Sequence, residues 1–145
     1  MRIFTIGLTK TSAERFFETI TASGAKRLVD VRLNNVSQLS GFAKRDDLAY
    51  FLRRISGIEY VHLRLLSPTQ DILDAYKREG EWERYAAEFV ELMTSRRIET
   101  AIAPEMITDS CLLCSERKPD RCHRRLVAEY FQQHWPNVDI THLEP

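Results

Sequence analysis

The stretch Ser110-Cys111-Leu112-Leu113-Cys114-Ser115 has four apolar residues in a row, and a polar turn and a segment with helical spacing follow it. A short apolar run of this kind is typical of a strand that is buried on both faces of a parallel sheet. Within residues 120–135, apolar side chains recur at intervals of three and four, which predicts a long amphipathic helix. Such a strand followed by such a helix is the building unit of a parallel α/β sheet.

The same alternation of short apolar runs and helix-like segments extends along all 145 residues. Strands are predicted over Arg2–Leu8, Arg27–Arg32, Glu59–Leu65, Ser110–Ser115 and Val138–Leu143. Helices are predicted over Thr11–Ala22, Asp47–Ile55, Thr69–Arg78, Trp82–Thr94 and Asp120–Trp135, with a shorter piece around Ile98–Ala103. We therefore expect one α/β domain over residues 1–145, a three-layer sandwich of about five mostly parallel strands with helices on both faces.

Composition narrows the class of protein further. An apolar fraction of 43% with 10% aromatic residues indicates a packed core rather than a disordered chain. No apolar run approaches the roughly 18 residues of a membrane span, and three cysteines suit reduced thiols better than a disulfide framework. We expect a cytoplasmic protein with no membrane partner.

Charge favours a small anionic ligand over a nucleic acid. The formal net charge is zero, which disfavours general binding to nucleic acid. Basic residues nevertheless predominate within 26–54 and 111–125, and acidic residues within 71–91, so one region of the molecule can attract an anion. The signatures of nucleotide hydrolases, dinucleotide-binding enzymes, zincins and α/β-hydrolases do not occur.

Several polar residues stand where predicted strands end. Thr9 follows the first strand, Asp30 and Arg32 close the second, and Cys114 and Glu116 lie at the end of the fourth. The carboxyl ends of parallel strands share one edge of a sheet, and ligands of open α/β sheets bind outside that edge. The sequence therefore predicts a single pocket there.

The segment from Cys114 to Arg125 carries the most chemistry. A thiol near a helix N-terminus has a lowered pKa, and His123 lies on the apolar stripe of the predicted helix, where it faces the sheet. Three interpretations stay open for Cys114, Cys122 and His123: a thiolate nucleophile with an imidazole base, a metal site, or buried structural groups. Cys111 faces away from Cys114 on a strand and is assigned to the core.

In the leading hypothesis, the chain is an enzyme acting on a small anionic substrate. Cys114 or Cys122 is the reactive thiolate, His123 moves the proton, and Glu116 and Asp30 orient these groups. Substrate binding is assigned to a second set of residues, namely Arg32, Arg124, Ser37, Lys44 and Thr9. The alternative is a metal- or nucleic-acid-binding module without turnover. Neither a cofactor nor an oligomeric state follows from the sequence.

The order of these motifs resembles the family catalogued as domain of unknown function 488. The resemblance rests on Thr5-Ile6-Gly7, Val29-Asp30-Val31-Arg32, Ser37, Phe42, Gly57-Ile58-Glu59-Tyr60-Val61-His62-Leu63 and Leu113-Cys114-Ser115-Glu116 with Pro119 and Cys122-His123-Arg124. It implies a small α/β protein of the prokaryotic cytoplasm with an enzyme-like set of polar residues and no established reaction. Carried over by position, that set is Asp30, Arg32, Ser37, Cys114, Glu116, Cys122, His123 and Arg124.

Two positions depart from the family pattern. Leu8-Thr9 stands where many members have His-Ser, and Asn35 stands where many have proline. If a histidine after the first strand belongs to a common catalytic set, this chain lacks that group or supplies it from elsewhere, for example from His62.

Overall fold

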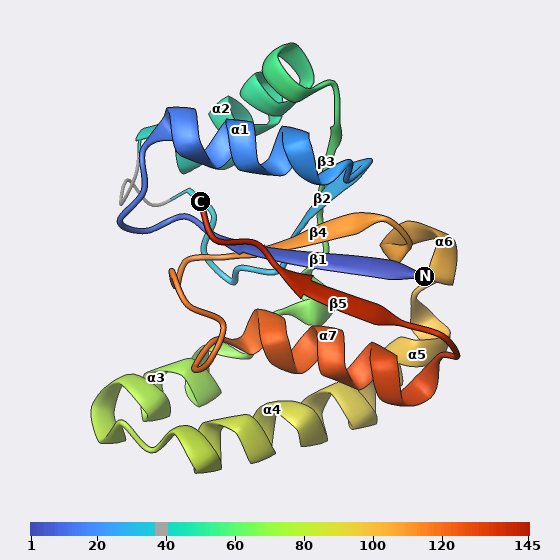
Figure 1. Ribbon diagram of the computed structural model, residues 1–145. Helices are drawn as coiled ribbons and strands as arrows, with labels where there is room; N and C mark the ends of the chain where they lie inside the picture. The colour runs from blue at the N-terminus through green and yellow to red at the C-terminus, as the bar shows by residue number, and fades with distance from the viewer. Residues whose placement is uncertain (37–40) are drawn as a thin grey trace.

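The computed structural model describes residues 1–36 and 41–145, and a five-stranded parallel sheet forms its middle layer. The strands are β1 (Arg2–Gly7), β2 (Arg27–Asp30), β3 (Glu59–His62), β4 (Ser110–Cys114) and β5 (Asp139–His142). Their order across the sheet is β3-β2-β4-β1-β5, and every pairing is parallel (Figure 1). The predicted α/β sandwich is confirmed, with the fully buried β4 at its centre.

Helices cover both faces of this sheet (Figure 1). One face carries α1 (Ala13–Ser23) and α2 (Arg45–Phe51). On the other side lie α3 (Gln70–Glu79), α4 (Trp82–Arg96), α5 (Ile98–Ala101), α6 (Pro104–Ile107) and α7 (His123–His134). The chain runs from β1 through β2 to β3 in one direction and returns through β4 to β5 in the other. Right-handed crossovers in opposite directions place their helices on opposite faces.

Two apolar clusters fill the spaces between the layers. The α1 side holds Phe4, Ile6, Leu28 and Leu113 against Phe16, Phe17 and Ile20. The α7 side holds Ile3, Val29, Val31 and Leu112 against Phe89, Val127 and Phe131. Alternation along β4 sends Cys111 into the first cluster and Cys114 into the second. Cys111 is fully buried, as the sequence predicted.

Element ends differ from the prediction where side chains compete with the backbone pattern. The second strand stops at Asp30 rather than Arg32, because the Asp30 carboxylate accepts a hydrogen bond from the Arg32 backbone N–H and turns the chain. The predicted helix over Asp47–Ile55 divides into α2 and a π-helical turn, Leu52–Ser56. Short 3-10 turns at Gly41–Ala43 and Arg64–Leu66, and the helix α6, were not predicted.

Within the described part of the chain, no helix combines the length and apolar character that crossing a bilayer requires.

Candidate functional site

A pocket of about 330 Å³ lies at the carboxyl edge of the sheet, where the sequence analysis expects one. The ends of β1, β2 and β4 form its floor, and α3, α4 and the start of α7 form its walls. Its lining consists of Leu8, Arg32, Leu33, Asn34, Ala43, Pro68, Leu73, Tyr76, Lys77, Tyr85, Cys114, Ser115, Glu116, Arg121, Cys122 and His123. The sheet therefore brings together side chains that are as far as 115 positions apart in the sequence.

A thiol and an imidazole meet in this pocket. Cys114 Sγ lies 3.4 Å from His123 Nδ1, and His123 Nε2 lies 2.7 Å from the carbonyl oxygen of Val31. A carbonyl oxygen only accepts, so Nε2 carries the proton and Nδ1 of the neutral ring is an acceptor. The ring is also held edge-on against Phe89, at 5.4 Å between ring centroids. His123 is thus oriented to take the proton of the Cys114 thiol.

The two pocket cysteines differ in their ionisation. The pKa of Cys114 is lowered, first by a hydrogen bond from the Cys122 thiol and further by the Arg124 charge and by the backbone N–H groups of Glu116 and Ser115, although burial opposes these effects. Burial raises the pKa of Cys122 well above its usual value, and the neighbouring Cys114 adds to this. Cys114 is therefore the group that ionises, and Cys122 remains a thiol that donates to it.

Arg124 does not line the pocket. Its side chain is fully buried, and it donates to the carbonyl oxygens of Glu116 at 2.5 Å and Arg117 at 3.2 Å and to Thr5 Oγ1 at 3.3 Å. No carboxylate pairs with it among the described residues. Direct binding of substrate by Arg124 therefore finds no support in this structure. The guanidinium instead holds the loop after β4 and favours the negative charge on Cys114.

Asp30 and Arg32 form a buried ion pair with each other. Nε and Nη2 of Arg32 each donate to a different Asp30 carboxylate oxygen at 2.9 Å, and the Tyr60 hydroxyl donates to the same carboxylate at 2.5 Å. Asp30 is fully buried and is absent from the pocket lining, so it orients Arg32 and does not meet a substrate. Burial raises the pKa of Tyr60, so its hydroxyl stays a donor.

Arg32 lines the pocket and has one nitrogen without a hydrogen-bond partner among the described residues. Its Nη2 donates to the carbonyl oxygen of Ala43 as well as to Asp30, whereas Nη1 has no partner among the described residues. Arg32 is 5% exposed and lines the pocket. Its Nη1 is not among the polar atoms that are fully buried and lack a hydrogen-bond partner. A guanidinium that is held in place in this way and has N–H groups left over favours binding of a ligand with negative charge.

The remaining sequence-predicted residues divide into three groups. Glu116 lines the pocket with an exposed side chain. Thr9 and Lys44 lie outside the lining, and Ser37 falls outside the residues that the structure describes. His62 Nε2 contacts the Arg32 carbonyl oxygen at 2.9 Å, so this histidine supports the strand end from behind and does not replace a pocket histidine.

Gly7 allows the loop after β4 to approach β1. A methyl group at Gly7 would lie 1.8 Å from the carbonyl oxygen of Glu116, closer than any real contact permits. The Ser115 carbonyl oxygen also accepts hydrogen bonds from the backbone N–H groups of Leu8 and Thr9. The loop that carries the N–H groups around Cys114 is therefore fixed against β1 by backbone contact.

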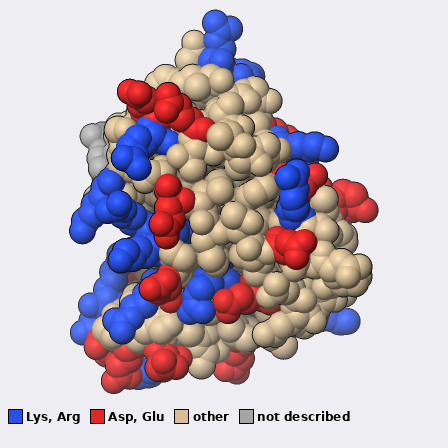
Figure 2. Space-filling view, viewed as in Figure 1, with Lys and Arg blue, Asp and Glu red and all other residues tan. Residues whose placement is uncertain are grey.

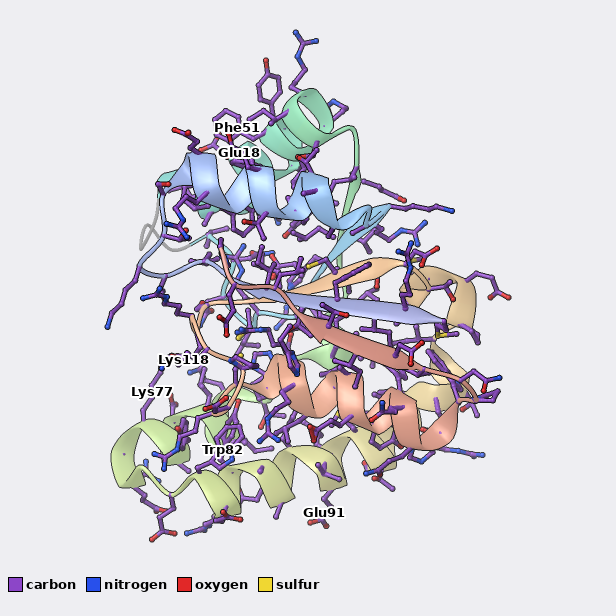
Figure 3. The ribbon with its side chains drawn as sticks, viewed as in Figure 1. Glu18, Phe51, Lys77, Trp82, Glu91 and Lys118 are labelled. Atoms are coloured by element: carbon purple, nitrogen blue, oxygen red, sulfur yellow. The ribbon has the colours of Figure 1, made fainter. Side chains whose placement is uncertain are left out.

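Sequence reasoning missed the pocket wall that α3 and α4 contribute. It consists of Tyr76, Lys77 and Tyr85, and Arg121 from the loop before α7 lies near it. Figure 3 shows Lys77 and Lys118 at the end of the molecule where the strands finish. Figure 2 shows Lys and Arg side chains gathered along that side. The i, i+3, i+7 spacing of Trp82, Tyr85 and Phe89 is typical of a core-facing stripe, and helical spacing alone does not separate a core face from a pocket wall.

Three potential metal ligands also converge here. One ligand atom each from Cys114, Cys122 and His123 lies within 4.8 Å of the others, and all three residues are buried. Two sulfurs and an imidazole nitrogen form a ligand set that suits zinc, and the pocket leaves room for a fourth ligand. The Nε2–H bond to Val31 is the kind of second contact that orients a metal-binding histidine.

The fold and the site together define a small parallel α/β protein with a Cys–His pocket at the carboxyl edge of its sheet. A family model for the domain of unknown function DUF488 matches residues 12–131 of the 145, and the chain belongs to this family. No curated protein and no solved structure matches the chain. The chemistry must therefore be argued from the pocket itself.

Proposed function

We propose that this protein is a thiol-dependent enzyme that transfers a group from a small anionic substrate by way of Cys114. The observation that carries the proposal is the contact between Cys114 Sγ and His123 Nδ1, with Nε2 held on a backbone carbonyl. A nucleophile, a base and a group that orients the base are the three parts of an activated thiol. The setting that the family resemblance implies, the cytoplasm of a prokaryote, belongs to the same proposal, because a reducing compartment keeps free thiols intact.

The chemical step begins with transfer of the Cys114 proton to Nδ1 of His123. The thiolate then forms a bond to an electrophilic carbon of the substrate, and the bond to the leaving group breaks with its electron pair. The imidazolium returns the proton to the leaving group. In a second step, the oxygen of a water molecule forms a bond to the same carbon while His123 takes a proton from it. The carbon–sulfur bond then breaks with its electron pair on sulfur, and His123 gives the proton to the Cys114 sulfur as the product leaves.

Charge in the pocket supports an anionic substrate. Arg32 lines the pocket, and its Nη1 has no partner among the described residues. The first residues of α7 also line the pocket, and backbone N–H groups at a helix N-terminus attract anions. Lys77 and Arg121 add exposed positive charge and form no ion pair within the described chain. Glu116 is the acid in the lining, and we assign it an orienting role. Nucleic acid is not favoured, because these charges surround a pocket of small-molecule size.

A zinc-binding module is the second candidate, and the convergence of Cys114, Cys122 and His123 favours it. In that case the two sulfurs and Nδ1 would hold the ion, and Cys114 would be a ligand with no nucleophilic role. The two candidates make opposite predictions for the reactivity of Cys114.

Iodoacetamide labelling of the purified protein, read by mass spectrometry, tests the proposal. We expect Cys114 to react faster than glutathione at pH 7, inorganic phosphate to slow the reaction, and Cys111 to stay unmodified. The variant Cys114→Ser should lose the labelling, and the matched variant Cys111→Ser should keep it. Metal analysis of the same sample covers the second candidate. If the protein holds one zinc per chain and Cys114 is labelled only after chelation, the enzyme proposal is wrong and the zinc-binding module is supported.

A further inference from the structure

We propose that the pocket takes an anion built on a planar ring, and that the Tyr85 hydroxyl donates a hydrogen bond to the substrate atom beside the reacting carbon. This inference rests on the proposed function, because it assigns the substrate class to the same pocket. It depends on the placement of an aromatic wall, the Tyr85 hydroxyl and the cations Lys77, Arg121 and Arg32 around Cys114.

The aromatic wall is continuous from the mouth of the pocket to the imidazole. Tyr76 of α3 and Tyr85 of α4 lie 4.6 Å apart between ring centroids, and Tyr85 lies 6.4 Å from Phe89 in a stacked arrangement. Phe89 in turn packs edge-on against His123. Tyr76 and Tyr85 both belong to the pocket lining. Aromatic rings offer flat apolar surface on which another ring packs well.

Apolar side chains complete the surface that a ring would contact. Leu8, Leu33, Pro68 and Leu73 line the pocket together with the two tyrosines. A fully solvated small ion such as free phosphate would leave this surface without a partner. A ligand with an apolar body uses it, because removing apolar surface from water on both sides is favourable.

The Tyr85 hydroxyl is a donor without a use in the protein. Tyr85 is 4% exposed, and its oxygen forms no hydrogen bond with the described residues. Tyr85 lines the pocket, and its oxygen is not among the fully buried polar atoms that lack a partner. It lies close enough to interact electrostatically with both Cys114 and Cys122. A bound ligand can therefore accept a hydrogen bond that the described residues leave unused.

The cations around the pocket favour a ligand that carries negative charge. Lys77 follows Tyr76 on α3, and Arg121 stands on the loop before α7 (Figure 3 labels Lys77). Arg32 supplies the two N–H groups of Nη1 from the strand side. A ring between the tyrosines and the sulfur can therefore carry a carboxylate or phosphate that reaches a cation.

Four alkylating probes separate these contributions. The first, 2-bromo-1-(4-carboxyphenyl)ethanone, is planar and anionic and places a carbonyl oxygen beside the reacting carbon. The others are 2-bromo-1-phenylethanone without the carboxylate, iodoacetate without the ring, and iodoacetamide with neither feature. In each reaction a C–S bond to Cys114 forms and the carbon–halogen bond breaks with release of halide. Every rate is divided by the rate of the same probe with glutathione.

We expect saturation kinetics for the planar anion and a normalised rate at least about tenfold above those of the other three probes, which corresponds to one well-placed interaction. Tyr85→Phe should lower the rate of the planar anion about tenfold. It should leave unchanged the rate of 4-(bromomethyl)benzoate, a planar anion that has no oxygen on the atom beside its reacting carbon. Tyr76→Leu should raise the half-saturating concentration. Tyr50→Phe, an exposed position outside the pocket, is the matched control and should change neither rate.

The outcomes distinguish this inference from the proposed function. If iodoacetamide labels Cys114 rapidly and the planar anion has no advantage, the substrate class is wrong and the thiol enzyme stands. If no probe modifies Cys114, the proposed function itself fails. If Tyr85→Phe slows 4-(bromomethyl)benzoate as much as the planar anion with the carbonyl group, Tyr85 maintains the structure of the pocket and is not a donor to the substrate.

Discussion

The three cysteines show how neighbouring residues of one type acquire different properties. Cys111 and Cys114 lie three positions apart on β4 and point to opposite sides of the sheet, so one is sealed in the core and the other faces the pocket. Cys122 precedes the α7 helix and donates its proton toward Cys114. Burial without a positive partner raises a thiol pKa, whereas donors and nearby cations lower it.

This difference predicts the pH dependence of labelling. The pKa of Cys114 is lowered, so its thiolate persists at pH values where an ordinary thiol is protonated. Between pH 9 and pH 6 the iodoacetamide rate at Cys114 should fall less than the rate of glutathione. Cys111 and Cys122, whose pKa values are raised, should stay unlabelled at neutral pH. Peptide mass spectrometry on samples quenched at each pH measures all three residues, and equal pH profiles would contradict the assignment.

The buried pair of Asp30 and Arg32 allows a second prediction at this scale. Asp30→Ala leaves a guanidinium that is 5% exposed without its carboxylate, and breaking a buried pair in this way costs about 3–5 kcal/mol. Urea unfolding should show a correspondingly lower midpoint. The exposed pair of Arg45 and Asp46 supplies the control, because Asp46→Ala removes a solvated partner and should change stability little. Similar losses in both variants would contradict the role of burial.

Among the elements, the loop after β4 is held in place from two sides. Its carbonyl oxygens accept from Arg124 on one side, and Gly7 of β1 leaves room for its backbone on the other. This contact joins two segments that are more than one hundred positions apart in the sequence. The arrangement gives Cys114 two backbone N–H donors without any side chain that must be ordered first.

Gly7→Ala should therefore disturb the site more than its small size suggests. The added methyl group overlaps the Glu116 carbonyl oxygen, so the loop must move, and overpacking of this kind costs about 1–3 kcal/mol. We expect slower labelling of Cys114 together with a lower unfolding midpoint. Gly41→Ala is the matched control, because no described residue lies within 4 Å of a methyl group at that position. Unchanged labelling in Gly7→Ala would show that the loop adapts freely.

The elements also show what the sequence could and could not predict. Apolar runs located all five strands, and the apolar stripe of α7 correctly turned His123 toward Cys114. The apolar stripe of α7 did not predict that Arg124 is buried. The partners of Arg124 are backbone carbonyl oxygens, and only the folded loop brings them close to its guanidinium. The sequence also did not predict that Tyr85 lines the pocket, since α4 uses one stripe both for core packing and for the pocket wall.

For the whole molecule, the shared sheet makes the two cores depend on each other. The strands β1, β2 and β4 each contribute side chains to both apolar clusters, one cluster on each face of the sheet. Both tryptophans, Trp82 and Trp135, pack on the α7 side, so their fluorescence reports that side alone. Far-UV circular dichroism reports helices on both sides.

We expect a substitution on one side to be detected from the other. Ile6→Ala removes buried apolar atoms on the α1 side and should cost about 2–5 kcal/mol. Because the strand is shared, tryptophan fluorescence and circular dichroism should shift to the same lower midpoint in urea. Val127→Ala on the α7 side serves as the comparison and should behave alike in both signals. A fluorescence midpoint that ignores Ile6→Ala would show that the two cores unfold separately.

The strand order has a consequence for synthesis on the ribosome. β1 and β2 both hydrogen-bond to β4 and not to each other, so their facing edges stay vacant until the fourth strand has been translated. A nascent chain that ends before Ser110 has β1, β2 and β3 but lacks β4, the strand that joins β1 to β2. The Cys114 thiol belongs to this fourth strand, and the His123 imidazole follows nine positions later. A half-made chain therefore does not hold the Cys114–His123 pair, which assembles only when the sheet is complete.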